Sequence, residues 1–284
     1  MPSEIRSRYV MTNGVKTHYW ESGGDGPVIV GLHGGGAGSS GLAGMGPLLE
    51  RLGSDYRVIA PDSIGGFGKT DPYAPVPLGL MSRVHHTADF IDALCLDKVS
   101  LVGNSQGAWT AVQYALLNPE RVEKLVLISS LTIANSLGIK QRQTDAGRAL
   151  AEYDGTREGM KRILQALIID PKRITDKLIE ERQAAATRPG ALESFRAFGK
   201  NTAKLRANQV YALQNDMTKS LPTLTTAIPT IFIWGESDTF ALPETGREIE
   251  KHVPDAKFHW VAGAGHQVQT DCPDETAKII RAFL

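Results

Sequence analysis

Short apolar runs that end in glycine-rich loops recur along the chain, and a helical pattern separates two of them. The runs are PVIVGLHGGG (27–36), YRVIAPDSIGGFG (56–68) and KVSLVGNSQG (98–107). Between the last two, RVHHTADFIDALCLD (83–97) places apolar residues at helical spacing. Short apolar runs are typical of strands that are buried on both faces. Strands that alternate with helices predict an α/β fold, with a mostly parallel sheet covered by helices.

Strand patterns near both ends of the chain predict further strands of this sheet. RYVMTNGVKTHYWESG (8–23) alternates and breaks at Asn13-Gly14, which predicts a β-hairpin with His18 as a structural residue of its second strand. The strand pattern resumes at PTIFIWGESD (229–238) and KFHWVAGAGH (257–266), and the last residues predict a closing helix.

The middle of the chain has a different character. From about residue 131 to 215 it is rich in Ala, Arg, Glu, Gln and Leu, and its patterns are helical with no strand between them. Three such patterns cover 156–168, 173–189 and 191–206, with Thr156 and Thr175 as expected N-caps of the first two. We therefore expect a core formed by residues 1–133 and 213–284, with a helical lid over 134–212.

Composition narrows the class of protein. The 284 residues are 42% hydrophobic, enough for a large core, and 31 basic residues balance 31 acidic ones. This balance predicts neither a nucleic acid nor a membrane surface as partner. A small-molecule substrate is expected from the motifs described below. Cys95 and Cys272 match no metal-ligand spacing and predict free thiols. The polar N-terminus lacks a signal-peptide core, so a cytoplasmic protein is expected.

A G-x-S-x-G element stands where a strand gives way to a helix. Gly103-Asn104-Ser105-Gln106-Gly107 follows the apolar run VSLV and precedes an apolar helical pattern. In this setting the turn is tight and strained, and the flanking glycines avoid collisions with the neighbouring strand and helix. Ser105 is therefore predicted to be a nucleophile at the carboxyl edge of the sheet.

A serine nucleophile needs a base, and the base needs an acid. His266 follows the last predicted strand and leaves the same sheet edge as Ser105. Asp238 ends the strand before it, and we prefer it to Glu236 because it lies further into the loop. The chain order Ser105, Asp238, His266 is the order expected of an α/β-hydrolase triad.

The remaining histidines have other expected roles. His33 opens the HGGG loop and is expected to shape it, whereas His85 and His86, in a predicted helix, favour surface or capping roles. His252 and His259 lie before or within the last strand, on the wrong side of the catalytic loop.

The tetrahedral oxyanion needs two backbone N–H donors. The residue after the nucleophile, Gln106, supplies one, and Gly35 or Gly36 of the HGGG loop supplies the other. A phosphate-binding interpretation of this loop fails, because no G-K-[ST] follows it. The Gly68-Lys69-Thr70 stretch lacks the required upstream glycine, and it predicts a turn.

Together these motifs resemble the α/β-hydrolase superfamily over nearly the whole chain. The signals are HGGG (33–36), APDSIGGFGKTD (60–71), the GNSQG elbow, WGESD (234–238) and GAGH (263–266). Within the superfamily, HGGGAG, Asn104 and the helical insert resemble the meta-cleavage product hydrolases. The resemblance implies cleavage of a C–C bond next to a ketone in 2-hydroxy-6-oxo-dienoates from bacterial breakdown of aromatic rings. It implies no metal or organic cofactor, and members are often homo-oligomers.

The resemblance also assigns substrate contacts. A lid arginine of the family holds the substrate carboxylate, and the matching position is Arg182 in LIEERQ. Gly36, Asn104 and Gln267 are further expected contacts, although Asn104 has the alternative of bonding within its own turn. The chain departs from the family at two pocket positions, where Gln106 replaces a methionine and Gln267 a tryptophan. These polar residues leave open a carboxylesterase or lactonase, and a ligand receptor that retains the hydrolase fold is a third hypothesis.

Overall fold

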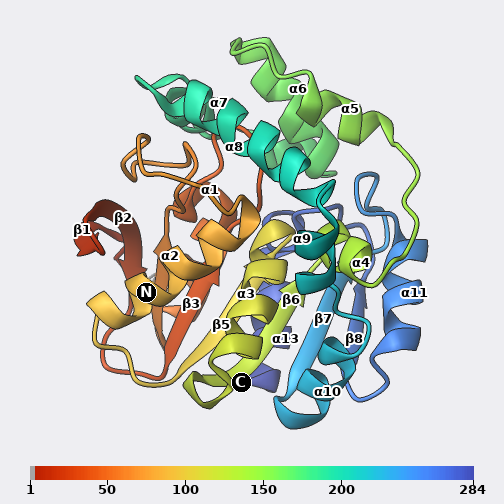
Figure 1. Ribbon diagram of the computed structural model, residues 1–284. Helices are drawn as coiled ribbons and strands as arrows, with labels where there is room; N and C mark the ends of the chain where they lie inside the picture. The colour runs from red at the N-terminus through yellow and green to blue at the C-terminus, as the bar shows by residue number, and fades with distance from the viewer. Residues whose placement is uncertain (1–3) are drawn as a thin grey trace.

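A computed structural model describes residues 4–284 and contains one sheet of eight strands in the order β1-β2-β4-β3-β5-β6-β7-β8 (Figure 1). The strands are β1 (Arg6–Thr12), β2 (Val15–Ser22), β3 (Val28–Leu32), β4 (Arg57–Pro61), β5 (Val99–Asn104), β6 (Val122–Ile128), β7 (Thr230–Gly235) and β8 (Lys257–Val261). Among the strand pairs of residues 4–284, β1–β2 and β2–β4 are antiparallel and the other five are parallel. The predicted α/β fold with a mostly parallel sheet is confirmed.

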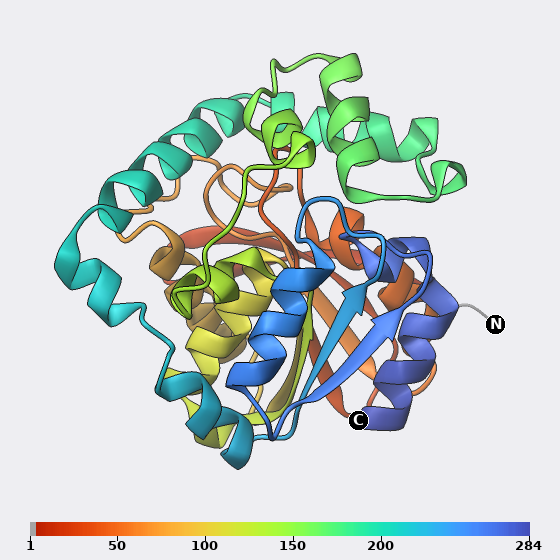
Figure 2. The ribbon, with the colours of Figure 1, turned by 90° about the vertical axis from the view of Figure 1, so that its right-hand side faces the viewer.

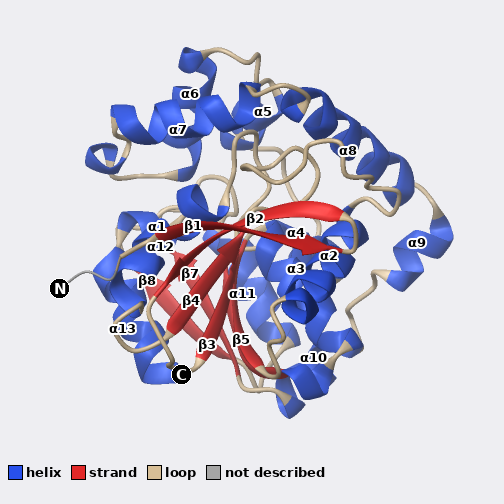
Figure 3. Cartoon of the chain, turned by 90° about the vertical axis from the view of Figure 1, so that its left-hand side faces the viewer, coloured by secondary structure: helices blue, strands red, loops and turns tan. Residues whose placement is uncertain are grey.

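Helices cover both faces of the sheet (Figure 3). One face carries α1 (Gly41–Leu52), α12 (Val268–Asp271) and α13 (Pro273–Phe283), and the other carries α2 (Leu80–Ala93), α3 (Gln106–Leu117), α4 (Leu131–Ser136), α10 (Ser220–Ala227) and α11 (Pro243–His252). Successive strand residues point to opposite faces, so Ile29 packs with the first set and Val30 with the second. This explains why the central strands are continuous apolar runs.

Five further helices lie between β6 and β7 in the chain: α5 (Asp145–Ala151), α6 (Arg157–Leu167), α7 (Asp176–Thr187), α8 (Ala191–Arg206) and α9 (Gln209–Gln214). Short 3₁₀ segments occur at Pro119–Arg121 and Pro171–Arg173. Helices α5 to α8 stand above the carboxyl ends of the strands, and α9 leads from the end of α8 down toward α10 (Figures 1 and 2). Among the described residues, no helix combines the length and apolar character needed to cross a membrane.

The helices above the sheet have an apolar cluster of their own. Met160, Ile163 and Leu164 of α6 pack with Ile179 of α7, separately from the two clusters that line the sheet. Both expected N-caps are confirmed: the side chains of Thr156 and Thr175 accept hydrogen bonds from backbone N–H groups in the first turns of α6 and α7.

The N-terminal hairpin is tied to the loop after β4. Asn13 and Gly14 have φ values of 47° and 84°, as a two-residue hairpin turn requires. His18 is fully buried, and its Nδ1 donates to Oδ2 of Asp62 at 2.7 Å. The Asp62 carboxylate also accepts the backbone N–H of Lys69, so the Gly68-Lys69-Thr70 stretch is the predicted turn, folded around this carboxylate.

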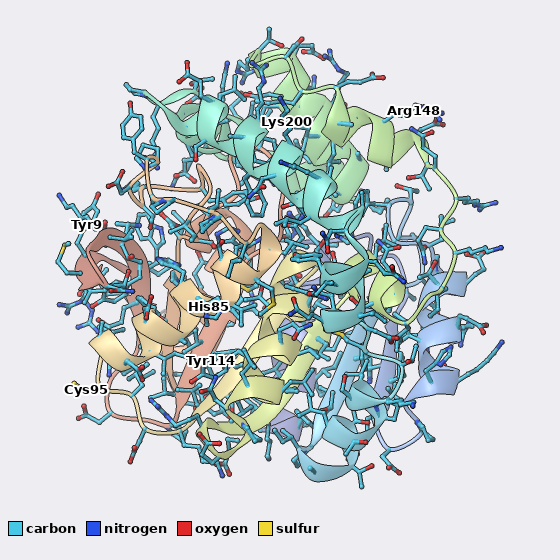
Figure 4. All side chains as sticks on the ribbon, viewed as in Figure 1. Tyr9, His85, Cys95, Tyr114, Arg148 and Lys200 are labelled. Carbon is cyan, nitrogen blue, oxygen red and sulfur yellow. The ribbon has the colours of Figure 1, made fainter. Side chains whose placement is uncertain are left out.

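One histidine prediction is wrong. His86 has neither a surface nor a capping role: it is buried, and its Nε2 is hydrogen-bonded to Thr17 Oγ1 of β2 at 2.8 Å. The inner face of α2 packs against the hairpin, and His86 lies on that face. The neighbouring His85 is exposed, as expected (Figure 4).

Candidate active site

Ser105 lies at the sharp turn between β5 and α3. Its φ of 57° and ψ of −118° are strained for a residue with a side chain. Two hydrogen bonds hold this conformation: Ser105 N–H donates to the Ile128 carbonyl at the end of β6, at 2.8 Å, and the Ser130 side chain donates through Oγ to the Ser105 carbonyl at 2.7 Å. Two neighbouring strand ends therefore fix the turn that presents the hydroxyl.

The glycines on either side of Ser105 are required by close backbone contacts. A Cβ on Gly103 would lie 2.4 Å from the Gly107 carbonyl oxygen, and a Cβ on Gly107 would lie 2.0 Å from the Leu32 carbonyl oxygen of β3. Leu32 is paired with Gly103 in the β3–β5 register, so the elbow and the loop after β3 begin side by side.

Asp238 and His266 form a buried pair beside this turn. His266 Nδ1 donates to Asp238 Oδ2 at 2.9 Å, and Asp238 Oδ1 accepts the backbone N–H groups of Phe240 and Ala241 at 2.8 and 2.7 Å. The carboxylate is thus held by three donors, which fix its orientation toward the imidazole. Glu236 is exposed, so of the two candidate acids it is Asp238 that contacts the imidazole.

A cavity of about 190 Å³ lies over the elbow. Seven predicted site residues line it: Gly35, Gly36, Asn104, Ser105, Gln106, His266 and Gln267. The hydrogen bonds among residues 4–284 include none from Ser105 Oγ to His266, so the two side chains share the cavity wall without a direct bond. Such bonds are often long before substrate binds.

The loop after β3 is shaped by a neutral histidine. The Nε2 of His33 accepts the Ser63 N–H at 3.0 Å, so Nδ1 carries the ring proton and donates to the Gly34 carbonyl at 2.7 Å. Burial, with the nearby Arg83 charge, lowers the pKa of His33 to about 3. The expected role in shaping this loop is therefore supported by two hydrogen bonds.

The same loop distinguishes the two glycines that were candidates for the oxyanion hole. The N–H of Gly36 donates to Ser39 Oγ at 3.2 Å. The N–H groups of Gly35 and Gln106 have no hydrogen-bond partner among the described residues, and both residues line the cavity. The backbone N–H of Gly35 is therefore available to a ligand, whereas that of Gly36 is already used.

Arg182 lies one layer behind the cavity wall. Its side chain, from α7, is 1% exposed, and Nη2 donates to Ser39 Oγ and to the Ala37 carbonyl, both at 3.1 Å. Its Nε has no partner, and no carboxylate of the described chain lies within 4.0 Å of the guanidinium. Burial lowers the pKa of Arg182 to about 10, which leaves it charged at neutral pH. Its Nη2 lies 3.4 Å from the Cβ position of the cavity residue Gly36.

The other two expected contacts are anchored to the protein. Asn104 does not bond within its own turn: its Nδ2 donates to the carbonyls of His266 and Ile128, at 3.1 and 3.3 Å. The Gln267 N–H donates to the Leu167 carbonyl of α6 at 3.0 Å. The loop after β8 is thus joined to the elbow through the His266 carbonyl and to α6 through the Gln267 N–H.

Several residues at the site were missed by the sequence analysis. Ser39, Leu131, Thr132, Asn135, Leu150, Leu167, Arg206 and Phe240 also line the cavity. Arg83 is a further omission, buried behind Gln106. A signal for it exists, because Arg83 lies in line with the buried Leu80, Thr87 and Phe90 of α2 at spacings of three and four. A charged residue within an apolar helical stripe is unusual and indicates a buried partner.

Comparison with known proteins identifies the family to which the chain belongs. Residues 27–272 match the family model described as alpha/beta hydrolase fold. The chain is 31% identical over 278 residues to a 2-hydroxy-6-oxo-6-(2'-aminophenyl)hexa-2,4-dienoic acid hydrolase of Metapseudomonas resinovorans, covering 98% of this chain and 90% of that one. It is 28% identical over 277 residues to a 2-hydroxy-6-oxo-2,4-heptadienoate hydrolase of Pseudomonas putida, covering 98% and 95%.

Solved structures lead to the same group. A meta-cleavage product hydrolase from Pseudomonas fluorescens IP01 superposes with a TM-score of 0.80 at 28% identity, over 97% of this chain and 96% of that chain. A serine hydrolase involved in carbazole degradation has a TM-score of 0.75 at 30% identity, over 99% and 98%. The chain belongs to the α/β-hydrolase family and is a hydrolase related to the meta-cleavage product hydrolases.

Proposed function

We propose that the protein hydrolyses the C–C bond beside the 6-keto group of a 2-hydroxy-6-oxo-dienoate, with Ser105 as nucleophile, His266 as base and Asp238 as the acid that orients it. The strained elbow, the Asp238–His266 bond and the shared cavity support these roles. The names of the relatives support the class of substrate, because each is named for a 2-hydroxy-6-oxo acid.

The observation that carries the choice of an acid substrate is the environment of Arg182. The Arg182 charge has few partners at the edge of the cavity: Nη2 contacts two neutral acceptors, Ala37 and Ser39, and the buried Nε contacts none among the described residues. A substrate carboxylate beside Ser39 and Gly36 would supply the missing negative charge. A neutral ester offers no such partner, so the arrangement favours a carboxylate substrate over a simple ester.

The reaction begins with a proton shift in the substrate. His266 assists removal of the proton from the 2-hydroxy group, and protonation at C5 gives the 2,6-diketo form. In this form the C5–C6 bond lies next to the C6 carbonyl, and its electron pair can delocalise through C4, C3 and the C2 carbonyl. Ketonisation therefore makes C5 a stabilised leaving group.

Ser105 then attacks C6 as His266 takes the hydroxyl proton, and the oxyanion receives the N–H groups of Gln106 and Gly35. Breaking of C5–C6 leaves the acyl group on Ser105 and releases the electron pair as a dienolate, which takes a proton to become the 2-hydroxydienoate. Water, activated by His266, then hydrolyses the acyl ester to a carboxylic acid and restores the serine.

We propose that residues 134–212 form a lid over this chemistry. Their helices have a separate apolar cluster, and the cavity lies between them and the core, with Leu150, Leu167 and Arg206 on one side and Gly35 and Ser105 on the other. Ligand sites commonly occupy such a seam. Helix α4 crosses the first boundary and packs on α3, so movement of the lid would begin after Ser136.

Turnover of ring-fission dienoates and of neutral aryl esters by the same protein tests the proposal. We expect dienoate cleavage that is lost in Ser105→Ala. Arg182→Met should lower kcat/KM on dienoates about tenfold to hundredfold, the value of a hydrogen-bonded charge pair, and leave the neutral esters unchanged. Rapid ester turnover with no dienoate cleavage would identify an esterase or lactonase instead. Ligand binding without turnover, equal in Ser105→Ala, would indicate a receptor.

A further inference from the structure

Arg83 is a buried cation that contacts both the HGGG loop after β3 and Gln106 of the elbow. Its side chain, from α2, is 2% exposed. Nη2 donates to the His33 carbonyl at 2.8 Å, Nη1 to Gln106 Oε1 at 2.9 Å and Nε to Ser63 Oγ at 2.9 Å. The guanidinium also lies 5.0 Å from the centre of the Phe67 ring. No carboxylate of the described residues lies within 4.0 Å, so neutral acceptors and this ring solvate the charge.

The contact with Arg83 fixes which way the Gln106 carboxamide points. A guanidinium has donors and no acceptor, so the atom that faces it must be the amide oxygen. The amide nitrogen, Nε2, is therefore on the opposite side of the group, and it has no hydrogen-bond partner among the described residues. Gln106 itself lines the cavity, so this N–H₂ group is available to a bound molecule.

The Gln106 amide lies against the loop that holds the other oxyanion donor. A Cβ on Gly35 would be 2.6 Å from Gln106 Nε2 and 2.0 Å from Oε1, so the amide occupies the space that any side chain there would need. The Gln106 carboxamide and Gly35 are therefore in contact, and both residues line the cavity.

We propose that Gln106 Nε2 is a third donor to the oxygen of the scissile carbonyl, and that Arg83 is the residue that positions it. Preorganised donors aimed at developing charge stabilise the transition state without reorganisation. The Arg83 charge polarises the amide through Oε1, which strengthens the N–H donor on the other side. The inference rests on the proposed Ser105 chemistry, but it is independent of whether the leaving group is a carbanion or an alkoxide.

The test compares wild type with Gln106→Met, Gln106→Glu, Arg83→Met, Arg83→Lys and the Arg83→Met/Gln106→Met double variant. Methionine preserves the length of the Gln106 side chain and the backbone N–H but removes Nε2. Glutamate keeps an acceptor for Arg83 and directs an oxygen, instead of a donor, at the oxyanion. Gln113→Met, two turns further along α3, is the matched control for the same replacement away from the cavity.

We expect Gln106→Met to lower kcat about tenfold with little change in KM, because the donor acts on the transition state and two other donors remain. Gln106→Glu should lose more. Arg83→Met should lower kcat when Gln106 is present but should hardly change it in the Gln106→Met background. Arg83→Lys should retain part of the kcat that Arg83→Met loses. Equal effects of Arg83→Met in both backgrounds, or unchanged kcat in Gln106→Met, would overturn the inference.

Affinity for an aryl boronic acid gives a readout that does not need the natural substrate, because boronates form a tetrahedral adduct with an activated serine. Weaker binding in Gln106→Met and unchanged binding in Gln113→Met are expected. Adduct formation in wild type with equal affinity in Gln106→Met would refute the third donor and leave the proposed nucleophile intact. No adduct in wild type would refute both.

Discussion

Replacement of Asp238 by asparagine tests the histidine tautomer on which the proposed mechanism depends. Oδ1 of Asp238 accepts two backbone N–H groups, from Phe240 and Ala241. Asparagine keeps these bonds only with its amide oxygen in that place, so its NH₂ group must face Nδ1 of His266. Nδ1 then becomes an acceptor and the ring proton moves to Nε2, where it prevents the imidazole from accepting the Ser105 proton.

The expected loss is about 10⁴-fold in kcat, or about 5 kcal/mol of transition-state stabilisation. Because both backbone bonds and the side-chain volume are retained, the free energy of unfolding should change by less than about 1 kcal/mol. The variant is therefore predicted to be well folded and nearly inactive.

The chain contains its own control for this variant, a second buried His–Asp pair. Oδ1 of Asp62 accepts the Gly41 N–H at 2.6 Å, and Oδ2 accepts the Lys69 N–H and the His18 ring N–H, each at 2.7 Å. In Asp62→Asn either orientation of the amide sets an NH₂ group against a backbone N–H. We expect this variant to lose about 1–3 kcal/mol of unfolding free energy and to retain its kcat.

Steady-state kcat and urea unfolding of the two purified variants measure the contrast. A kcat for Asp238→Asn above about a tenth of the wild-type value would refute the tautomer argument. A loss of kcat in folded Asp62→Asn as large as that in Asp238→Asn would refute the assignment of different roles to the two pairs.

Two further predictions concern stability. Burial holds the pKa of His33 near 3 and that of His86 near 4. Below about pH 6.5, the pKa of histidine in the unfolded chain, the unfolded state therefore binds more protons than the folded state. Between about pH 7.5 and pH 5, each histidine should lower the free energy of unfolding by about 2 kcal/mol, because about 1.5 pH units lie below that pKa at about 1.36 kcal/mol each. An equal midpoint of urea unfolding at both pH values would contradict this. Gly107→Ala, whose Cβ would lie 2.0 Å from the Leu32 carbonyl oxygen, should cost more than about 3 kcal/mol or prevent folding. Gly46→Ala in α1, where the nearest atom is 3.4 Å away, should leave the melting temperature unchanged or higher.

Much of the fold could be predicted because its signals are local. The Asn13-Gly14 turn and the N-cap of α6 at Thr156 depend on residues only a few positions apart. The site followed from topology: in a parallel sheet the carboxyl ends of all strands share one edge, so loops that leave β5, β7 and β8 must bring Ser105, Asp238 and His266 near one another.

Other features depend on packing between distant segments, and the sequence pattern did not reveal them. Helix α1 contains several glycines and a proline, which are weak helix formers, and no element was predicted there. Tertiary packing stabilises this helix, and Gly41 allows its close contact with β4, where a Cβ would lie 2.2 Å from the Ala60 carbonyl oxygen. His86 was misassigned for the same reason, since its partner Thr17 is far away in the chain.

Gln106 and Arg83 are better understood together than separately. The resemblance to the meta-cleavage product hydrolases leads one to expect methionine after the nucleophile, and Gln106 then looks like an isolated departure. In the structure, Gln106 is an acceptor for a buried guanidinium. A methionine at this position would leave Nη1 of Arg83 without that partner, a loss that costs about 1–3 kcal/mol or more for a charged group. The glutamine therefore belongs with the arginine, and the pair holds the Gln106 carboxamide against Gly35, at a position where the family pattern has a thioether.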